Sequence, residues 1–528
     1  MDVAQLIERL SKPEAFPRPV SDVEVKQTHI SLVFIAGDVV YKVKKPVRLS
    51  FLDFSTLELR RHFCNEEVRL NRRLAPDVYV GVVPITTDGD RLRFEGQGEP
   101  IEWAVKMHRL PVEATLEELV DSERVSAEQV ADLGRRLARF HQTAASSPEI
   151  FTSGRFDNVA RNIRENFEIS ASTVGKTVSQ AVWDRLLDTV EKNLAELRRL
   201  IDARAARGVP RDTHGDLHLD HVYLFRDRQE PGDLVIVDCI EFNERFRFTD
   251  PVADLAFLVM DLRFHGRWDL AQVLFDSWCR ESQDEEGKSL LPLYSSYRAA
   301  VRGKVECLLL REAEVPETAK VEAFQRARGH WLLALSSLEP PGSRPALVMV
   351  GGLPGTGKST VARAIGASHG FQVIRSDVVR KELAGLSAET PAGGAIGNGL
   401  YTPEWTDRTY SECRARAEAA LWEGGRVAVD ATFLDETHRR QYLDTARRFG
   451  VPVLFLVCEA DPEVTRARIA ARHGDASDAD WAVYEDASRR WDAPSSVTSR
   501  VTRRIETGGS LEIAIQSATA ALRAERIA

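Results

Sequence analysis

The chain has 528 residues, too many for one ordinary hydrophobic core, and this length indicates roughly two to four domains. With 43% hydrophobic and 29% charged residues, the composition is typical of a soluble globular protein, and no stretch has the ~18 consecutive apolar residues of a membrane-spanning helix. The formal net charge of −9 disfavours indiscriminate binding to nucleic acid or to an anionic membrane, although a local basic groove is compatible with it.

The first residues, Met1–Leu6, carry no basic patch followed by an apolar stretch, so we expect no secretion signal. The six cysteines are scattered and form no Cys-x-x-Cys pair; they are Cys64, Cys239, Cys279, Cys307, Cys413 and Cys458. This spacing fits reduced thiols better than a disulfide framework or a zinc site. We therefore expect a cytoplasmic protein that does not bind membranes.

Two elements near the start of the chain predict a first ion pair. β-Branched residues around 39–43 predict a strand that contains Lys42, and a capping-box pattern that begins at Ser55 predicts a helix over about 55–74. On that helix Glu67 shares a face with apolar residues, and a carboxylate on a packed face needs a partner. Lys42 is the candidate partner; the alternative is that Glu67 borders solvent.

From about residue 127 the pattern is mainly helical, but two short apolar runs at 222–225 and 234–238 interrupt it. A polar turn separates these runs, which predicts a hairpin. Such a hairpin would bring Asp216, which precedes its first arm, close to Asp238 at the end of its second arm. One carboxylate could then orient a hydroxyl group while the other holds magnesium.

These pieces together resemble the aminoglycoside phosphotransferase and choline-kinase branch of the protein-kinase-like fold, over about residues 25–310. The resemblance implies a bilobal domain in which Lys42 and Glu67 form the ion pair at the nucleotide. It also implies that Asp216, in the sequence His-Gly-Asp, lies in the catalytic loop and that Asp238 is a metal ligand.

Other segments extend this resemblance. Asp254 would brace the catalytic loop, and Met107–Pro111 would be the hinge between the lobes. Gln27–Ser31, Tyr41–Pro46 and Asp238–Asn243 look like a bacterial group in which such a domain is fused to a P-loop kinase-like domain.

The sequence departs from the kinase pattern in two places. Gln27–Ser31 stands where kinases have a glycine-rich loop, and His221 stands where the family has an asparagine metal ligand. Magnesium prefers oxygen ligands, so an imidazole at His221 should weaken the second metal contact. The N-terminal part is therefore either an active kinase or a nucleotide-binding pseudokinase with a regulatory role. We interpret the cluster of His214, His218 and His221 as loop structure around a phosphotransfer site and not as a metal site.

Proline, glycine and serine are concentrated at 336–344, which predicts a linker between a domain at 1–335 and a second domain at 345–528. Behind the linker, apolar runs alternate with helical patterns, which favours a parallel sheet flanked by helices. These strand-like runs are 346–350, 427–429 and 453–457.

The first of these runs leads into a phosphate-binding loop, Gly-x4-Gly-Lys-Ser, that a helical pattern follows. Its glycines let backbone N–H groups turn toward phosphates, and the helix N-terminus adds a positive dipole. Lys358 would supply charge to the β- and γ-phosphates, and the Ser359 hydroxyl would ligate magnesium. The predicted nucleotide site consists of Gly352, Gly355, Thr356, Gly357, Lys358, Ser359 and Thr360.

Two further carboxylates follow strand-like runs. Asp430 ends the run that begins at Val427, a usual place for a group that helps to hold magnesium; the alternative is an aspartate that caps the next turn. Asp377 and Arg380 stand three apart on one face of a predicted helical turn. Asp377 could take a proton from an attacking hydroxyl and Arg380 could hold a substrate anion, or the two could form a surface ion pair.

This set resembles the P-loop kinases that include polynucleotide 5′-hydroxyl kinases, gluconate-type kinases and zeta-type toxins, over roughly 345–528. The resemblance implies that Asp377 is a base or a substrate ligand, and that a lid carries arginines over the ATP phosphates. The lid would follow Asp461 and include Arg468 and Arg472, although these arginines could equally form a solvated helix face.

The sequence thus predicts a multidomain α+β and α/β protein: a bilobal kinase-like fold followed by a P-loop parallel α/β fold. The leading function is ATP- and Mg²⁺-dependent phosphorylation of a hydroxyl group on a small molecule. One alternative is a nucleotide-sensing regulatory or toxin-neutralising module with a pseudokinase half. Another is a polynucleotide 5′-hydroxyl kinase, which the lack of lysine and arginine at 385–404 disfavours.

Overall fold

The computed structural model describes residues 3–49, 51–89, 91–310, 315–387, 390, 399–471, 477 and 479–528. These residues form two compact units. The first unit comprises Met1–Val159, Arg198–Asp261 and Asp269–Leu290. The second comprises Ala160–Leu197, Leu262–Trp268 and Leu291–Ala528. The predicted linker at 336–344 lies inside the second unit, so the domain limits inferred from the sequence stay a prediction.

The first unit opens with a six-stranded antiparallel sheet in the order β1-β2-β3-β8-β6-β7. Its strands are β1 (Glu24–Gln27), β2 (Ser31–Ala36), β3 (Val39–Lys44), β6 (Tyr79–Asp88), β7 (Arg91–Phe94) and β8 (Pro100–His108). Beside it lie α1 (Val3–Leu10), η1 (Pro13–Ala15) and the short pair β4 (Arg48–Leu49) and β5 (Leu52–Asp53). Phe34, Tyr41 and Phe94 pack against Leu6 and Leu10 of α1, which makes α1 part of the core of this sheet.

The helix predicted over 55–74 is α2 (Leu57–Asn71). The capping box that the sequence predicted at Ser55 is wrong, because the N-cap residue is Thr56, whose hydroxyl accepts a hydrogen bond from Leu59 N at 3.2 Å. The Ser55 hydroxyl donates instead to Asp53 Oδ1. A local turn therefore engages the first serine and moves the helix start by one residue.

The rest of the first unit is mainly helical. The elements are η2 (Val112–Ala114), α3 (Leu116–Asp121), α4 (Ala127–Thr143), α5 (Pro148–Ser153), η4 (Leu219–His221), α8 (Glu244–Arg247), α10 (Trp268–Ser282) and η5 (Glu286–Ser289). Two antiparallel pairs interrupt them: β9 (Arg211–Asp212) with β12 (Phe248–Thr249), and β10 (Val222–Leu224) with β11 (Leu234–Ile236). The second pair is the hairpin that the sequence predicted.

The second unit begins with helices, and α6, α7, α9 and α10 each have residues in both units. These elements are α6 (Phe156–Ser170), η3 (Ala171–Thr173), α7 (Gln180–Ala206), α9 (Pro251–Phe264), α11 (Leu291–Leu309) and α12 (Glu317–Leu338). Trp183, Trp331 and Phe167 form a buried aromatic cluster between α6, α7 and α12, with ring centroids 5.5–6.3 Å apart. None of the described helices has the length and apolar composition that crossing a bilayer requires.

The predicted linker is shorter than expected because α12 continues to Leu338. Ser336 and Ser337 are buried in its last turn, where the Ser337 hydroxyl donates to Leu333 O at 2.8 Å. A serine that bonds back to the preceding turn fits a helix, so these serines do not interrupt it.

The remainder of the second unit is a five-stranded parallel sheet in the order β14-β15-β13-β16-β17. Its strands are β13 (Ala346–Gly351), β14 (Gln372–Arg375), β15 (Arg426–Asp430), β16 (Val453–Glu459) and β17 (Thr502–Glu506). The three strand-like runs of the sequence are β13, β15 and β16, as predicted. Because they are buried on both faces, they are continuous in apolar residues and do not alternate with polar ones.

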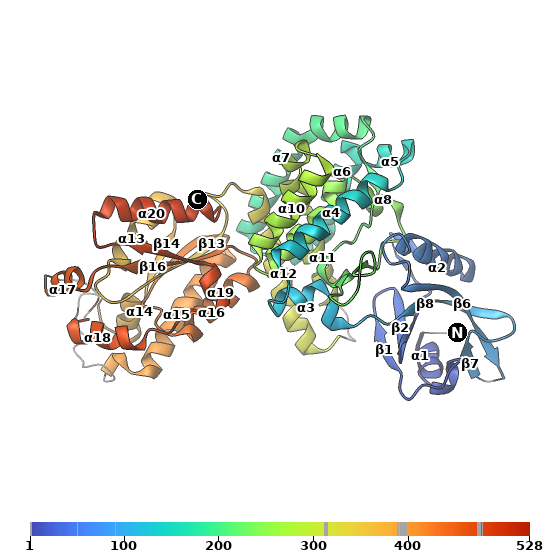
Figure 1. Cartoon of the computed structure of the whole chain (residues 1–528), viewed down its shortest axis with the longest axis horizontal. Coiled ribbons are helices and arrows are strands. Elements are labelled where there is room, and N and C mark those ends of the chain that lie inside the picture. The colour runs from blue at the N-terminus through green and yellow to red at the C-terminus, as the bar shows by residue number, and fades with distance from the viewer. Residues whose placement is uncertain are drawn as a thin grey trace. The chain divides into compact units, whose positions relative to one another are not determined.

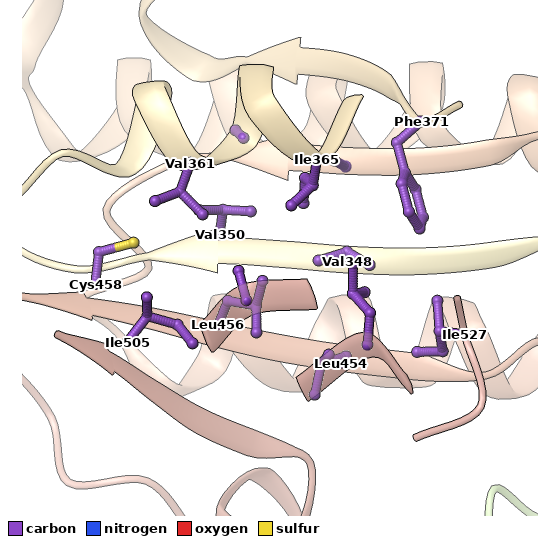
Figure 2. Close-up of a cluster of buried hydrophobic side chains, with 14 of the residues drawn as sticks. Val348, Val350, Val361, Ile365, Phe371, Leu454, Leu456, Cys458, Ile505 and Ile527 are labelled. Carbon is purple, nitrogen blue, oxygen red and sulfur yellow. The ribbon is translucent and has the colours of Figure 1, made fainter. Parts of the chain in front are cut away.

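Helices cover both faces of this sheet (Figure 1). They are α13 (Lys358–His369), α14 (Ser376–Leu383), η6 (Gly399–Tyr401), α15 (Pro403–Trp422), α16 (Glu436–Arg448), α17 (Pro462–Ala470), α18 (Trp481–Arg490), α19 (Ser496–Arg500) and α20 (Leu511–Ala524). On the face of α13 and α20, Val361 and Ile365 pack against Val348 and Val350 of the central strand (Figure 2).

A close backbone contact joins α12 to the turn between α16 and β16. Gly450 has φ +61°, and a Cβ atom placed on it would lie 2.4 Å from Gly329 O in α12. Alanine at this position would meet both the left-handed backbone cost and an overpacked contact.

We predict that Gly450→Ala lowers the free energy of unfolding by about 2–4 kcal/mol, the sum of about 1 for the backbone and about 1–3 for the clash. Gly370→Ala is the matched control, because Gly370 has φ +69° and nothing lies within 4 Å of its Cβ position. Urea unfolding of the full chain measures both variants. Equal destabilisation of the two would show that the contact with α12 is not tight.

Candidate functional site

The phosphate-binding loop joins the end of β13 to the start of α13, the arrangement that the motif requires. Gly352 has φ +130°, and a Cβ atom on it would lie 2.3 Å from Cys458 O. Gly355 and Gly357 have φ +81° and +93°, and Gly357 is the N-cap of α13. The loop therefore depends on glycine for backbone conformation at all three positions and for space at Gly352.

Lys358 is the first residue of α13, and its ammonium donates to Leu353 O at 2.9 Å. Thr356 Oγ1 donates to the same carbonyl at 2.8 Å. The ammonium is thus held against the loop by a hydrogen bond, so that the charge lies beside the backbone N–H groups at the helix N-terminus. That combination favours bound phosphate.

Three strands end side by side at this edge of the sheet. The register pairs Val350 of β13 with Asp430 of β15, and Asp430 with Arg375 of β14. The Asp430 carboxylate is 4% exposed and accepts a hydrogen bond from Ser359. Arg375 Nε lies 3.4 Å from Asp430 Oδ2. The loop serine and the strand-end aspartate therefore meet, as the candidate magnesium ligands should.

Burial raises the pKa of Asp430, and the nearby negative charge of Asp377 raises it further. The charges of Lys358 and Arg375 and the Ser359 hydrogen bond oppose this shift without cancelling it. The negative charge of the Asp430 carboxylate is thus only partly neutralised by neighbouring groups of the protein. A divalent cation beside it would supply the missing positive charge.

These groups line a cavity of about 360 Å³ at the carboxyl ends of the parallel strands. Of the predicted site residues, nine line it: Gly355, Gly357, Lys358, Ser359, Thr360, Asp377, Arg380, Asp430 and Arg468. Gly352 and Thr356 do not. Gly352 packs against Cys458, and Thr356 is buried with its carbonyl accepting from Thr507 Oγ1 at 2.5 Å, so these two residues shape the loop from behind.

The arginines have different positions. Arg380 is 8% exposed, donates to Leu400 O at 2.7 Å and lies over the ring of Tyr401. Arg468, on α17, lines the cavity and donates to Thr507 O at 2.7 Å. The helix α17 begins at Pro462, behind the N-cap Asp461, as the sequence predicted. Arg472 lies outside the described residues.

Sequence reasoning missed several lining residues from α15, the turn after β15, and α18. They include Thr406, Tyr410, Asp435, Asp486 and Arg490. Thr406 and Tyr410 stand four apart on α15, a spacing that places them on one face, but no sequence motif connects this helix to the phosphate-binding loop. Burial raises the pKa of Tyr410 to about 12, so its hydroxyl stays protonated. This hydroxyl accepts from Phe433 N at 2.8 Å, and the Tyr410 ring stacks on His438.

A second group of charged residues lies in the first unit. Lys42 Nζ is 2.9 Å from Glu67 Oε1, so the ion pair expected from the sequence forms, and the same ammonium contacts Asp238. Burial opposes the charge on Lys42, but Asp238, Glu67 and Glu241 outweigh it and hold the Lys42 pKa well above its ordinary value. Burial likewise works against the Asp238 carboxylate, yet the Lys42 charge lowers the Asp238 pKa to about 2.

Lys44 is a partner that the sequence did not indicate. Its side chain is fully buried, donates to Glu67 Oε2 at 2.7 Å and also contacts Glu241. Because Lys42 and Lys44 are two apart on β3, both point to one face of the sheet, and both reach Glu67 on α2. The network joins the strand, the helix and the segment that follows β11.

The contact expected between Asp254 and the loop that contains Asp216 is present. The carboxylate of Asp254 accepts from His214 N at 3.1 Å and Gly215 N at 2.8 Å. Asp254 also lies 3.1 Å from His141 Nε2, and Trp278 Nε1 donates to His141 Nδ1 at 3.0 Å. Burial lowers the pKa of His214 to about 4, and the neutral ring donates through Nε2 to Val237 O. The loop backbone is therefore held from two sides.

Asp216 and Asp238 flank His221, as the predicted hairpin requires. His221 Nδ1 donates to Asp216 O at 2.9 Å, and His221 Nε2 lies 3.6 Å from Asp238 Oδ2. His218 Nε2 lies 3.2 Å from Asp216 Oδ2, and its Nδ1 contacts Asp220. Burial disfavours a charged His218, but Asp216 and Asp220 raise its pKa to about 10.

Two domain families match the chain. The model described as "Phosphotransferase enzyme family" matches residues 57–302, and the model described as "AAA domain" matches residues 347–494. Proteins of Mycobacterium tuberculosis and Mycobacterium bovis, each named only as uncharacterized, are 33% identical over 506 residues, covering 95% of this chain and 96% of theirs. The chain belongs to the same family as these mycobacterial proteins. This chain joins a phosphotransferase domain to a P-loop domain.

Several solved structures are similar to parts of this chain at low sequence identity. A choline/ethanolamine kinase family protein from Mesorhizobium loti is 12% identical, covers 63% of this chain and 97% of its own, and has a TM-score of 0.37. A gluconokinase from Sinorhizobium meliloti is 17% identical, covers 34% of this chain and 93% of its own, and has a TM-score of 0.26. Scores of this size give no information about substrate. With the domain matches, the predicted fold class is confirmed: a kinase-like domain followed by a parallel α/β P-loop domain.

The buried charge network generates a stability prediction. Lys44→Met leaves Glu67 and Glu241 without one shared cation in a buried site, and breaking such a pair costs about 3–5 kcal/mol of unfolding free energy. Lys26→Met is the control, because the Lys26 side chain is exposed on β1. Adding Glu241→Gln to Lys44→Met should recover part of the loss, since it removes the unpaired charge. Urea unfolding measures these variants and Glu241→Gln alone, and strictly additive losses in the double variant would contradict the network.

Proposed function

We propose that this protein is an ATP-dependent phosphotransferase that transfers the γ-phosphoryl group to a hydroxyl of a small molecule in the C-terminal cavity. The observation that carries the proposal is that Lys358, Ser359, Asp430 and Asp377 line one cavity. Lys358 and Ser359 belong to the phosphate loop, whereas Asp377 stands in the first turn of α14. A nucleotide side and an acceptor side are therefore available within the same space.

The residues on the nucleotide side fit magnesium. Ser359 and Asp430 offer only oxygen ligands, which Mg²⁺ prefers, and the buried Asp430 carboxylate has a raised pKa that a dication would relieve. Bound magnesium would supply Lewis-acid stabilisation of the phosphate oxygens. Lys358 and the N-terminus of α13 stabilise negative charge on the β- and γ-phosphates.

On the acceptor side, Asp377 is proposed as the general base. It accepts the proton of the acceptor hydroxyl while the new oxygen–phosphorus bond forms and the bond to the ADP leaving group breaks. Arg380 lines the same cavity from the next turn of α14 and is proposed to hold a negative group of the acceptor. Arg468 is proposed to contribute charge over the phosphates.

The shape and charge of the cavity favour a small, polar acceptor. A volume of about 360 Å³ is in the range of small-molecule sites, and part of it must take the nucleotide phosphates. Its lining is mixed in charge, because Arg363 and Arg490 line it together with Asp435 and Asp486, and a mixed lining suits a polar small molecule. A polynucleotide acceptor is therefore the weaker alternative.

A second kinase-like site is proposed in the first unit, favoured by the Lys42–Glu67 ion pair beside Asp238. Lys42 and Glu67 would contact the nucleotide, and Asp216 would orient an acceptor. The metal ligands proposed there, Asp238 and His221, do not match the all-oxygen set that magnesium prefers, so no step through magnesium follows from this site. A nucleotide-sensing pseudokinase is the alternative for this half.

The acceptor role of Asp377 is directly testable in the full chain. We predict that Asp377→Asn leaves the dissociation constant for ATP within about twofold and cuts acceptor phosphorylation by about 10²-fold or more, because the amide keeps the shape but removes the base. Lys358→Ala should abolish this turnover, and Asp444→Asn on the exposed face of α16 should not change it. Arg380→Ala should raise the apparent acceptor KM.

Calorimetric titration measures ATP binding, and a coupled assay measures ADP release in the presence of acceptor. Weakened ATP binding with unchanged acceptor turnover in Asp377→Asn would assign this carboxylate to the nucleotide and would refute its proposed role.

A further inference from the structure

Two imidazoles and two carboxylates converge at the start of the β10–β11 hairpin. One potential ligand atom from each of Asp216, His218 and His221 lies within 4.8 Å of the others. Asp238 Oδ2 approaches the same cluster, 3.6 Å from His221 Nε2. The rings of His218 and His221 lie with centroids 3.9 Å apart. Nitrogen and oxygen donors are therefore mixed in one place.

Each imidazole is oriented by a hydrogen-bond acceptor at its other nitrogen. His221 Nδ1 donates to Asp216 O, which leaves Nε2 with its lone pair facing Asp238. His218 Nδ1 contacts the Asp220 carboxylate, and its Nε2 is hydrogen-bonded to Asp216 Oδ2, so a metal ion at Nε2 would replace the proton in that bond. Metal-binding histidines are commonly held in this way, by a carboxylate or a backbone carbonyl that fixes the ring and its tautomer.

The spacing between the donor atoms also suits a small ion. Ligand atoms about 2.0–2.2 Å from a tetrahedral ion lie roughly 3.3–3.6 Å from one another. The separation of His218 Nε2 from Asp216 Oδ2 is 3.2 Å, and that of His221 Nε2 from Asp238 Oδ2 is 3.6 Å. The ligand atoms of Asp216, His218 and His221 lie within 4.8 Å of one another, so side-chain shifts would have to close them, and Asp238, around one ion.

We propose that Asp216, His218, His221 and Asp238 bind one divalent transition-metal ion, with Zn²⁺ preferred, in place of the magnesium of a kinase. Imidazole ligands favour Zn²⁺ over Mg²⁺, and along the first-row series affinity for such a site rises from Mn²⁺ through Co²⁺. Asp216 and Asp220 supply negative charge for a dication, whereas the charge of Asp238 is shared with Lys42. The alternative is an ion pair without a metal ion, in which a charged His218 lies between the carboxylates of Asp216 and Asp220.

This site would change what the kinase-like half can do. Asp216 occupies the position to which the family resemblance gives the catalytic role, and a carboxylate that holds a metal ion is a weaker proton acceptor. The inference concerns the first unit alone and does not rest on phosphoryl transfer in the C-terminal cavity.

The test uses the full chain, stripped of metal with a chelator, and no nucleotide. Calorimetric titration with ZnCl₂, CoCl₂ and MgCl₂ should give one tight Zn²⁺ site per chain, weaker Co²⁺ binding and no Mg²⁺ binding of comparable affinity. Asp220→Asn should weaken Zn²⁺ binding about 10- to 100-fold through loss of its hold on His218. Because the Asp220 side chain is 48% exposed, this variant should fold normally.

His221→Asn should weaken Zn²⁺ binding by at least tenfold, and His62→Asn, at an exposed position of α2, should leave it unchanged. Circular dichroism establishes that each variant is folded. The Co²⁺ complex gives a second readout, because visible absorption bands report nitrogen and oxygen ligands and should disappear in His221→Asn. Folded Asp220→Asn and His221→Asn variants that bind Zn²⁺ as the unaltered chain does, or an unaltered chain with no tight Zn²⁺ site, would overturn the proposal.

Discussion

The approach of the Gly352 backbone to Cys458 O is the contact on which the phosphate site depends. With 2.3 Å between that oxygen and the place of a Cβ atom, no other residue allows the chain to leave β13 and turn directly into α13. The turn is needed because β13 is the central strand, with β15 on one side and β16 on the other. At such a point the loops on the two sides diverge, and a ligand can enter at the carboxyl ends of the strands. The positions of Lys358 and Ser359 follow from that turn, and the pairing of β13 with β15 places Asp430 beside them.

Much of the C-terminal site could be predicted because its chemistry is local in sequence. The phosphate loop combines strand, glycines, lysine and helix within a few residues, and Asp430 ends a continuous apolar run. Tyr410 and Arg490 could not be predicted in the same way, because they reach the cavity from helices that no motif connects to the loop. Arg472 lies outside the described residues, whereas Arg468 lines the cavity on the helix that Asp461 predicted.

The first unit shows where sequence patterns were less informative. The Lys42–Glu67 pair could be predicted, since a carboxylate on an apolar helix face requires a cation. The contact of Lys44 with Glu241 could not be predicted, because the two residues are 197 positions apart and no sequence pattern pairs them. His218 and His221 were interpreted as loop structure, and only the fold places their nitrogens opposite Asp216 and Asp238. Residue types indicated the chemistry, but tertiary structure decides which atoms meet.

The proposed function requires that a small molecule in the C-terminal cavity accepts the phosphoryl group. The direct measurement is the rate of ADP formation by the full chain with Mg²⁺ and ATP, with and without a library of sugars, amino alcohols, polyols and a 5′-hydroxyl oligonucleotide. The account predicts that a small hydroxyl compound accelerates ADP formation and is recovered as its phosphate ester in equal amount. ATP consumption that no acceptor changes, with no ester formed, would contradict the account and favour a nucleotide-sensing protein.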